Sequence, residues 1–218
     1  MSKVRTLYIV GTGGFAKEVA QLATEINATK NQWDSISYVS VAEAEVGKPM
    51  PFGEVVGTDR IFKTLTHPAD VAIGIGNPGA RTKLGAWLLA NKLVRMPNLV
   101  HPVNGMDLNY VTLGHGNIVA RGAAFTCDIK VGDLNVFNLN STVGHDARIG
   151  SFNVINPGCN ISGAVSIGDG CLLGTGCQIL EGISIADGCK IGAGAVVVKS
   201  IDIENSVFVG IPAKALTK

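Results

Sequence analysis

The sequence predicts an α/β domain at the N-terminal end, followed by a prism of short parallel strands wound in repeating coils. Two observations carry this prediction. A glycine turn follows a short apolar run near the start of the chain, and a large apolar residue returns at every sixth position from Leu113 to Val197. A period of six fits neither an α-helix nor a single strand, so it indicates a structural repeat.

The repeat contains two columns of residues that we expect to point inward. The large apolar column comprises Leu113, Val119, Phe125, Val131, Phe137, Val143, Ile149, Ile155, Ile161, Ile167, Leu173, Ile179, Ile185, Ile191 and Val197. Four positions further on stands a compact column, which includes Asn117, Ala123, Asn135, Ser141, Ala147, Asn153, Cys159, Val165, Cys171, Cys177, Cys189 and Ala195. Glycine often follows the apolar residue directly, which places a permissive residue near each corner. These features predict a hexapeptide parallel β-helix of about five coils, with three strands and roughly 18 residues in each coil.

Composition limits the classes of function. The chain has 218 residues, 46% hydrophobic and 16% charged, which excludes wholesale disorder. Because the repeat fills only the second half, we expect two domains, residues 1–98 and 99–218. A net charge of +1 without a basic run gives no reason to expect a nucleic-acid or membrane partner. The first apolar run is too short for a signal peptide, and no run approaches about 18 apolar residues, so we expect a cytoplasmic protein.

The cysteines and histidines give no reason to expect a metal site. Four of the five cysteines fall in the compact column, so we predict that they are buried, reduced thiols that fill the prism corners. The repeat holds only His115 and His145, which are 30 positions apart and therefore do not stack at a spacing of 18. A zinc site built from three histidines is not expected.

The first 26 residues indicate a Rossmann-like start to the chain. An apolar strand, Leu7 to Val10, runs into a turn in which Gly11, Gly13 and Ala16 fit the G-x-G-x-x-G/A pattern, and a helical pattern follows. In such a turn the backbone approaches a phosphate and the helix N–H groups point at its charge. The second predicted strand ends at Ser40, where a nicotinamide dinucleotide site would carry an acid, so a redox cofactor is not expected.

A second glycine turn follows the third predicted strand. That strand covers residues 70–75, the turn contains Gly76 and Asn77, and a helix is predicted from Ala80 to Asn91. Ligands bind at the carboxyl ends of strands in open α/β sheets. The two glycine turns therefore predict one crevice of nucleotide size, and residues 99–106 are expected to lead into the prism.

His145 is the strongest candidate for chemistry within the repeat. It lies in a polar stretch, residues 138–146, beside Asp146. Imidazole is a natural general base near neutral pH, and a neighbouring carboxylate can fix its tautomer. Gly163 stands 18 positions later, one coil above, where its N–H would be available to a developing oxyanion. The alternative is a solvated histidine on a prism face.

Together these motifs carry a family resemblance. The glycine turn at the start, the hexapeptide repeats, the polar stretch 138–146 and the closing segment 209–214 resemble the bacterial nucleotide-sugar acyltransferases. These include the N-acetyltransferase of a UDP-4-amino-4,6-dideoxy sugar on the way to bacillosamine and the sialic acid O-acetyltransferases. The resemblance implies a left-handed β-helix, a homotrimer with active sites between subunits, and acetyl-CoA lying between neighbouring prisms.

The resemblance also implies roles for particular residues. His145 matches the base, Asn138 its polar partner, and Gly163 the donor to the oxyanion, whereas Asp146 replaces a glutamate and is one methylene shorter. Ser40 stands where many relatives have an acid. The residues expected to line the path of acetyl-CoA are Gly163, Thr175, Ala193, Pro212 and Lys214. Those expected to bind the nucleotide sugar are Gly11, Gly13, Gly14, Phe15, Ser40, Gly76 and Asn77.

The expected function is therefore an acetyl-CoA-dependent N-acetyltransferase, without a metal, that acts on a nucleotide-linked 4-amino-4,6-dideoxy sugar, with UDP as the expected nucleotide. Two alternatives stay open. One is an O-acetyltransferase of sialic acid or another free sugar, which shares the fold. The other, from a different class, is a non-catalytic trimeric scaffold that only binds a nucleotide.

Overall fold

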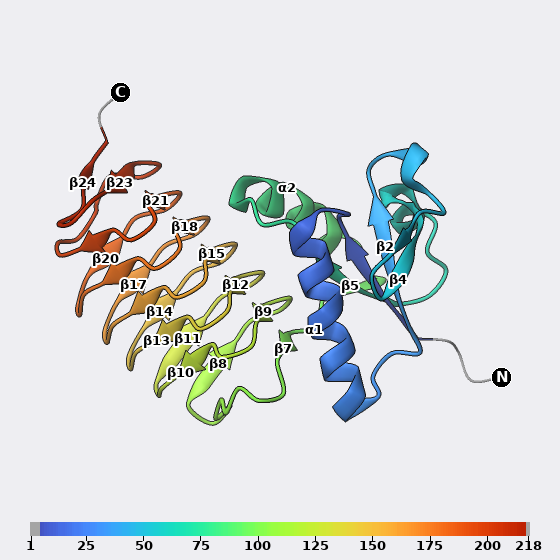
Figure 1. Ribbon diagram of the computed structural model, residues 1–218, viewed down its shortest axis with the longest axis horizontal. Helices are drawn as coiled ribbons and strands as arrows, with labels where there is room; N and C mark the ends of the chain where they lie inside the picture. The colour runs from blue at the N-terminus through green and yellow to red at the C-terminus, as the bar shows by residue number, and fades with distance from the viewer. Residues whose placement is uncertain (1–4, 217–218) are drawn as a thin grey trace.

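The computed structural model describes residues 5–216, and it consists of an α/β domain beside a long prism (Figure 1). The sheet of the first domain has six strands, which are parallel except for the antiparallel edge strand β3. Across the sheet the order is β3 (Pro49–Met50), β4 (Gly53–Thr58), β2 (Ser35–Ser40), β1 (Thr6–Val10), β5 (Ala69–Ile73) and β6 (Val94–Arg95). Two short 3₁₀ helices lie in its connections, η1 (Glu43–Glu45) between β2 and β3 and η2 (Asp59–Lys63) between β4 and β5. The predicted Rossmann-like start of the chain is confirmed.

The prism is built from three parallel sheets, each of which forms one face. The domain face contains β7 (Leu99–Val100), β9 (Ile118–Val119), β12 (Val136–Phe137), β15 (Val154–Ile155), β18 (Leu172–Leu173), β21 (Lys190–Ile191), β23 (Val207–Val209) and the antiparallel β24 (Lys214–Ala215). The groove face contains β8 (Val111–Leu113), β11 (Ile129–Val131), β14 (Arg148–Ile149), β17 (Ser166–Ile167) and β20 (Ser184–Ile185). The ladder face contains β10 (Ala124–Phe125), β13 (Thr142–Val143), β16 (Asn160–Ile161), β19 (Gln178–Ile179) and β22 (Val196–Val197).

Strands one coil apart pair at the predicted spacing of 18, as Val143 pairs with Ile161 and Ile161 with Ile179. The apolar column occupies the last residue of each strand from β8 to β22, and it forms one continuous core together with the compact column. The spacing shortens at the C-terminal end, where Ile185 meets Ile201 and Ile191 meets Phe208. The prediction of a left-handed hexapeptide β-helix is thus confirmed.

The glycines that directly follow the apolar column have a different role from the one predicted. Residues with a left-handed backbone stand three positions after the apolar column, and they include Leu134 at φ 58° and Asp146 at φ 59°. The glycines directly after the column are instead required by close approach between coils. A Cβ atom built on Gly150 would lie 2.7 Å from the carbonyl oxygen of Gly168 in the next coil.

The buried cysteines pack as predicted. Cys159, Cys171, Cys177 and Cys189 are all completely buried, and all are free thiols. Burial raises the pKa of Cys171 to about 12, so this side chain stays a neutral thiol at physiological pH. These four cysteines therefore serve as small apolar core residues.

Helix α1 (Gly14–Lys30) joins the two domains. One side of it packs on the sheet strands β1 and β2, and the same hydrophobic cluster continues into Ile118, Val136 and Val154 on the domain face. Figure 1 shows α1 lying between the sheet and the first coils of the prism. The first coils of the domain face are thus covered, while the ladder and groove faces remain outside this contact.

Helix α2 (Pro78–Leu89) forms the second junction. Asn77 caps it, because its Oδ1 accepts a hydrogen bond from the Ala80 N–H at 3.0 Å. The helix packs with Leu134 and Phe152 at the corner between the groove and domain faces. The α/β domain is therefore fixed to the prism at two places, on the domain face through α1 and on this corner through α2.

Candidate active site

His145 and Asp146 form a hydrogen-bonded pair at the corner between the ladder and groove faces. The Nδ1–H of His145 donates to Oδ2 of Asp146 at 2.9 Å, since a carboxylate can only accept. The shorter aspartate therefore does reach the imidazole. With the proton on Nδ1, Nε2 carries the free lone pair that a general base needs.

Gly163 lies against the ring of His145, as the 18-residue stacking predicts. A Cβ atom at Gly163 would come within 2.5 Å of Cε1 and 2.6 Å of Nε2 of His145, so only glycine fits without moving the ring. The Ala164 N–H donates to the carbonyl of His145 at 2.7 Å, which fixes the two coils together. Within residues 5–216 the Gly163 N–H meets no acceptor, and Gly163 itself is buried beneath the imidazole.

Within one chain, the structure does not bring Asn138 together with His145, the base that it is expected to partner. Asn138 occupies the next corner, between the domain and ladder faces, and its Oδ1 accepts a hydrogen bond from the Leu139 N–H at 2.7 Å. It lines a crevice of about 370 Å³ under α1, together with Phe15. The sequence period gives the spacing along the prism, but it does not tell which corner faces α1. The structure shows that the corner of Asn138 faces α1, beside Phe15.

An ionic cluster in this crevice was not anticipated from the sequence. The buried His101 contacts Glu25 of α1 at 2.7 Å between Nε2 and Oε2, and Arg121 contacts the same carboxylate at 3.2 Å. Burial acts to raise the pKa of Glu25, but hydrogen bonds from Gln21 and His101 outweigh it, so the pKa is lowered overall. Because these residues come from separate regions of the chain, no local sequence signal marks the cluster.

The residues predicted to contact acetyl-CoA lie on two corners. Thr175 and Ala193 are exposed and stack one coil apart on the Asn138 corner, where the Gly194 N–H donates to the carbonyl of Thr175 at 2.8 Å. Gly163 lies on the His145 corner, across the ladder face. Within one chain these residues do not form a single site.

Pro212 and Lys214 lie in the C-terminal hairpin. There Val209 pairs with Lys214, and the Ala213 N–H donates to the carbonyl of Val196 at 2.8 Å. The hairpin therefore contacts the last strand of the ladder face, β22. Since β23 and β24 belong to the domain face, this contact places Pro212 and Lys214 at the C-terminal end of the corner between the domain and ladder faces.

The two glycine turns do lie together, as predicted. A Cβ atom at Gly11 would come within 2.9 Å of the carbonyl oxygen of Gly74, and one at Gly76 would lie 4.0 Å from Phe15. A Cβ atom at either Gly13 or Gly14 would have no neighbour within 4 Å. The carboxyl ends of β1 and β5 and the N-terminus of α1 thus meet at one edge of the sheet, which is where α/β domains bind phosphates.

Glu45 is a residue of this edge that the sequence analysis missed. Its Oε2 accepts hydrogen bonds from Ser40 Oγ at 2.5 Å and from Thr12 Oγ1 at 2.9 Å. Ser40 is almost fully buried at the end of β2. A carboxylate therefore lies beside the position after β2 where an acid was expected, even though Ser40 itself carries no charge. The sequence signal for it was the presence of Glu45 five positions after Ser40.

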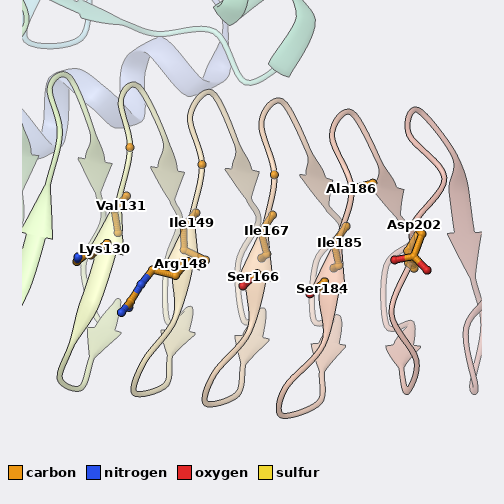
Figure 2. A pocket seen from close by; sticks show the side chains of 14 residues that line it. Lys130, Val131, Arg148, Ile149, Ser166, Ile167, Ser184, Ile185, Ala186 and Asp202 are labelled. Carbon is orange, nitrogen blue, oxygen red and sulfur yellow. The ribbon is translucent and has the colours of Figure 1, made fainter.

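A shallow groove of about 660 Å³ runs along the groove face (Figure 2). Lys130 and Arg148 lie at its N-terminal coils, Ser166 and Ser184 in the middle, and Asp202 at the other end. The groove contains none of the predicted site residues. The residues with predicted chemical roles therefore lie at the two corners that border the ladder face and at the glycine turns.

Within residues 5–216, no group of three or more His, Cys, Asp or Glu side chains is arranged to hold a metal ion. In the same part of the chain, neither helix has the length and apolarity that a membrane crossing requires.

Comparisons with known proteins agree with this architecture. Residues 6–88 match the PglD N-terminal domain family, and residues 164–199 match the bacterial transferase hexapeptide family. A search of curated proteins finds no match.

Three solved structures show how far the similarity extends. A variant of perosamine N-acetyltransferase from Caulobacter crescentus, in complex with CoA and GDP-perosamine, is 26% identical with a TM-score of 0.88, over 99% of both chains. The acetyltransferase domain of PglB from Neisseria gonorrhoeae, with acetyl coenzyme A, is 27% identical with a TM-score of 0.88, over 98% of this chain and 100% of that one. WeeI from Acinetobacter baumannii is 25% identical with a TM-score of 0.79, over 97% and 100%. The chain thus joins a PglD N-terminal domain to bacterial transferase hexapeptide repeats, and along nearly its whole length it is similar in fold to the perosamine N-acetyltransferase and to the PglB acetyltransferase domain.

Proposed function

We propose that this chain transfers the acetyl group of acetyl-CoA to the amine of a nucleotide-linked 4-amino-4,6-dideoxy sugar. The observation that carries the proposal is the His145–Asp146 pair at 2.9 Å with the Gly163 backbone directly over the imidazole. The similar structures with CoA, acetyl-CoA and GDP-perosamine support both substrate classes. The cytoplasm is the location we propose for this reaction.

The geometry supports direct transfer. Nε2 of His145 removes the proton as the sugar nitrogen attacks the thioester carbonyl, and Asp146 stabilises the imidazolium that forms. The Gly163 N–H stabilises the tetrahedral oxyanion. When the intermediate collapses, the new C–N bond remains, the C–S bond breaks, and the imidazolium proton passes to the thiolate of CoA. No acyl-enzyme is required.

We further propose that the site is completed between subunits of a homotrimer. The ladder face separates the His145 corner from the corner that carries Asn138, Thr175 and Ala193. A neighbouring prism that brings its own Asn138 corner against His145 would unite the two groups. Closed cyclic symmetry then gives each of the three subunits the same complete site.

The proposal does not depend on which base the nucleotide carries. The family resemblance favours UDP, whereas the Caulobacter structure contains GDP-perosamine. The glycine turns would hold the diphosphate through backbone N–H groups, a mode of binding that does not depend on the base. A thermal-shift panel of UDP, GDP, TDP and CMP sugars would identify the base, because ligands that bind the folded state raise its apparent stability.

The first prediction concerns His145, the proposed general base. His145→Ala should lower kcat by about 10²- to 10⁴-fold, which is the usual contribution of a general base. The Kd for CoA should stay close to that of the wild type, measured by calorimetry. His115→Ala is the matched control, since His115 is the other exposed histidine of the repeat and lies on a different corner. Near-normal kcat in His145→Ala would rule out the mechanism.

The same assay separates the alternative functions. Acetyl transfer to a nucleotide-linked amino sugar, with none to free sialic acid, supports the proposal. The reverse preference would indicate the O-acetyltransferase. Nucleotide binding without any binding of acetyl-CoA would indicate the non-catalytic scaffold, a function that the similarity to the perosamine N-acetyltransferase and to the PglB acetyltransferase domain does not favour.

A further inference from the structure

Glu45 is held firmly beside the first glycine turn. Its Oε2 accepts from Thr12, which lies within that turn, and from Ser40, which ends β2. The backbone around it is also fixed. The Gly47 N–H donates to the carbonyl of Val55 in β4 at 2.8 Å, and the Lys48 N–H donates to the carbonyl of Glu45 at 3.0 Å. The carboxylate is thus positioned before any ligand arrives.

The carboxylate also has unused capacity as an acceptor. Oε2 takes both hydroxyl donors, whereas among residues 5–216 the one polar contact of Oε1 is with Lys48, at 3.5 Å from Nζ. Hydrogen bonds from Ser40 and then Thr12 lower the pKa of Glu45, so it is ionised at neutral pH. An ionised carboxylate accepts up to about four hydrogen bonds and donates none, so its remaining partners must be donors.

The position of the carboxylate indicates which donors these are. A phosphate at the N-terminus of α1 places the attached ribose toward the end of β2, where acids of α/β domains accept hydrogen bonds from ribose hydroxyls. Ser40 cannot serve as that acid. Glu45 reaches the same edge from η1, through its contact with Ser40 itself.

We propose that Glu45 replaces the missing acid after β2, binds the ribose hydroxyls of the substrate's nucleotide, and selects ribonucleotide sugars over 2′-deoxyribonucleotide sugars. This inference rests on the proposed function, because it assumes a nucleotide at the glycine turns. It narrows the substrate class, since sugars linked to deoxythymidine diphosphate become poor ligands whatever sugar they carry.

The test is a set of binding measurements by calorimetry on the full chain. The ligands are UDP, GDP and their 2′-deoxy counterparts, and the proteins are the wild type, Glu45→Gln and Glu43→Gln. Glutamine keeps an oxygen for Thr12 and Ser40 but removes the charge. Glu43 is the matched control, because it lies in the same 3₁₀ helix and its carboxylate instead contacts Arg60.

The wild type should bind the better of UDP and GDP about tenfold or more tightly than the 2′-deoxy form, as expected for a hydrogen bond to a charged group. Glu45→Gln should lose this preference, and Glu43→Gln should keep it. An unchanged preference in Glu45→Gln would overturn the inference. The inference would also be overturned if Glu45→Gln lost GDP binding but still preferred UDP over its 2′-deoxy form. That result would show that Glu45 recognises the base of the nucleotide and not its ribose. Absence of all nucleotide binding to the wild type would overturn the proposed function as well.

Discussion

The backbone at Asp146 explains how its short carboxylate reaches the preceding imidazole. Asp146 adopts the left-handed conformation, φ 59°, which aspartate tolerates better than most residues. Its Oδ2 lies 2.9 Å from Nδ1 of His145. The sequence period could place Gly163 over His145, but it could not give the backbone angle at this corner. For that reason the reach of Asp146 could be established only from the structure.

Arg81 carries a prediction about stability. It is completely buried, and its guanidinium donates to the carbonyls of Leu134 at 3.0 Å and of Ile73 at 2.9 Å, which joins α2 and β5 to the prism. Burial lowers its pKa to about 9, so it remains charged at neutral pH. Arg81→Met should lower the free energy of unfolding by about 2 to 4 kcal/mol, because buried carbonyls lose their donors.

Chemical denaturation measures this change. Arg60→Met is the control, since the Arg60 side chain is 78% exposed and forms a salt bridge with an exposed glutamate. Its effect should stay within about 0.5 kcal/mol. Equal effects of the two substitutions would contradict the role assigned to Arg81.

At the scale of the elements, alanine substitutions at two glycines of the prism should have different effects, one on activity and the other on stability. A methyl group at Gly163 would meet the imidazole of His145, a side chain that can move away, whereas one at Gly150 would meet the backbone carbonyl of Gly168. Gly163→Ala should therefore lower kcat at least about tenfold with little change in Tm. Gly150→Ala should destabilise the fold by about 1 to 3 kcal/mol, as overpacking does, and leave the kcat of the folded protein unchanged.

Thermal unfolding and steady-state kinetics on both variants decide this. Gly105→Ala serves as the control, because a methyl group there would meet nothing within 4 Å and the backbone is not left-handed. A large loss of Tm in Gly163→Ala would show that the His145 corner is held as rigidly as the Gly150 corner.

The elements also show what the sequence could and could not predict. The apolar column predicted every coil from Leu113 to Val197, because a six-residue period repeats the same inward position. Strand β4 was missed, since Gly53 and Gly57 and the prolines before them disguise its pattern. The division of the chain at residue 98 stays a prediction, although β7 pairs with β9 of the prism. Contacts between distant segments, such as Glu45 with Thr12, leave no periodic signal.

At the scale of the whole molecule, the α/β domain determines which prism faces are free. It covers the first coils of the domain face through α1, and it holds Asn138 in a crevice beside Phe15. The ladder face lies between that corner and His145, with a row of hydrogen-bonded polar side chains from Thr142 through Asn160 to Gln178. The arrangement leaves the two halves of the proposed site on opposite sides of one face.

If the site forms between subunits, hybrid trimers should recover activity from two inactive variants. His145→Ala removes the base from one corner, and Ala193→Trp blocks the proposed path of pantetheine on the other, where Ala193 is exposed and a larger side chain does not disturb the core. Each variant alone should be inactive. In a cyclic trimer with both variants, one interface in three joins an intact His145 corner to an intact Ala193 corner, so about a third of the wild-type kcat should return.

The measurement uses co-expression with two affinity tags, sequential purification and an acetyl-transfer assay, with separately purified variants mixed just before the assay as the control. Hybrids that stay inactive would show that His145 and Ala193 serve one site within a single chain.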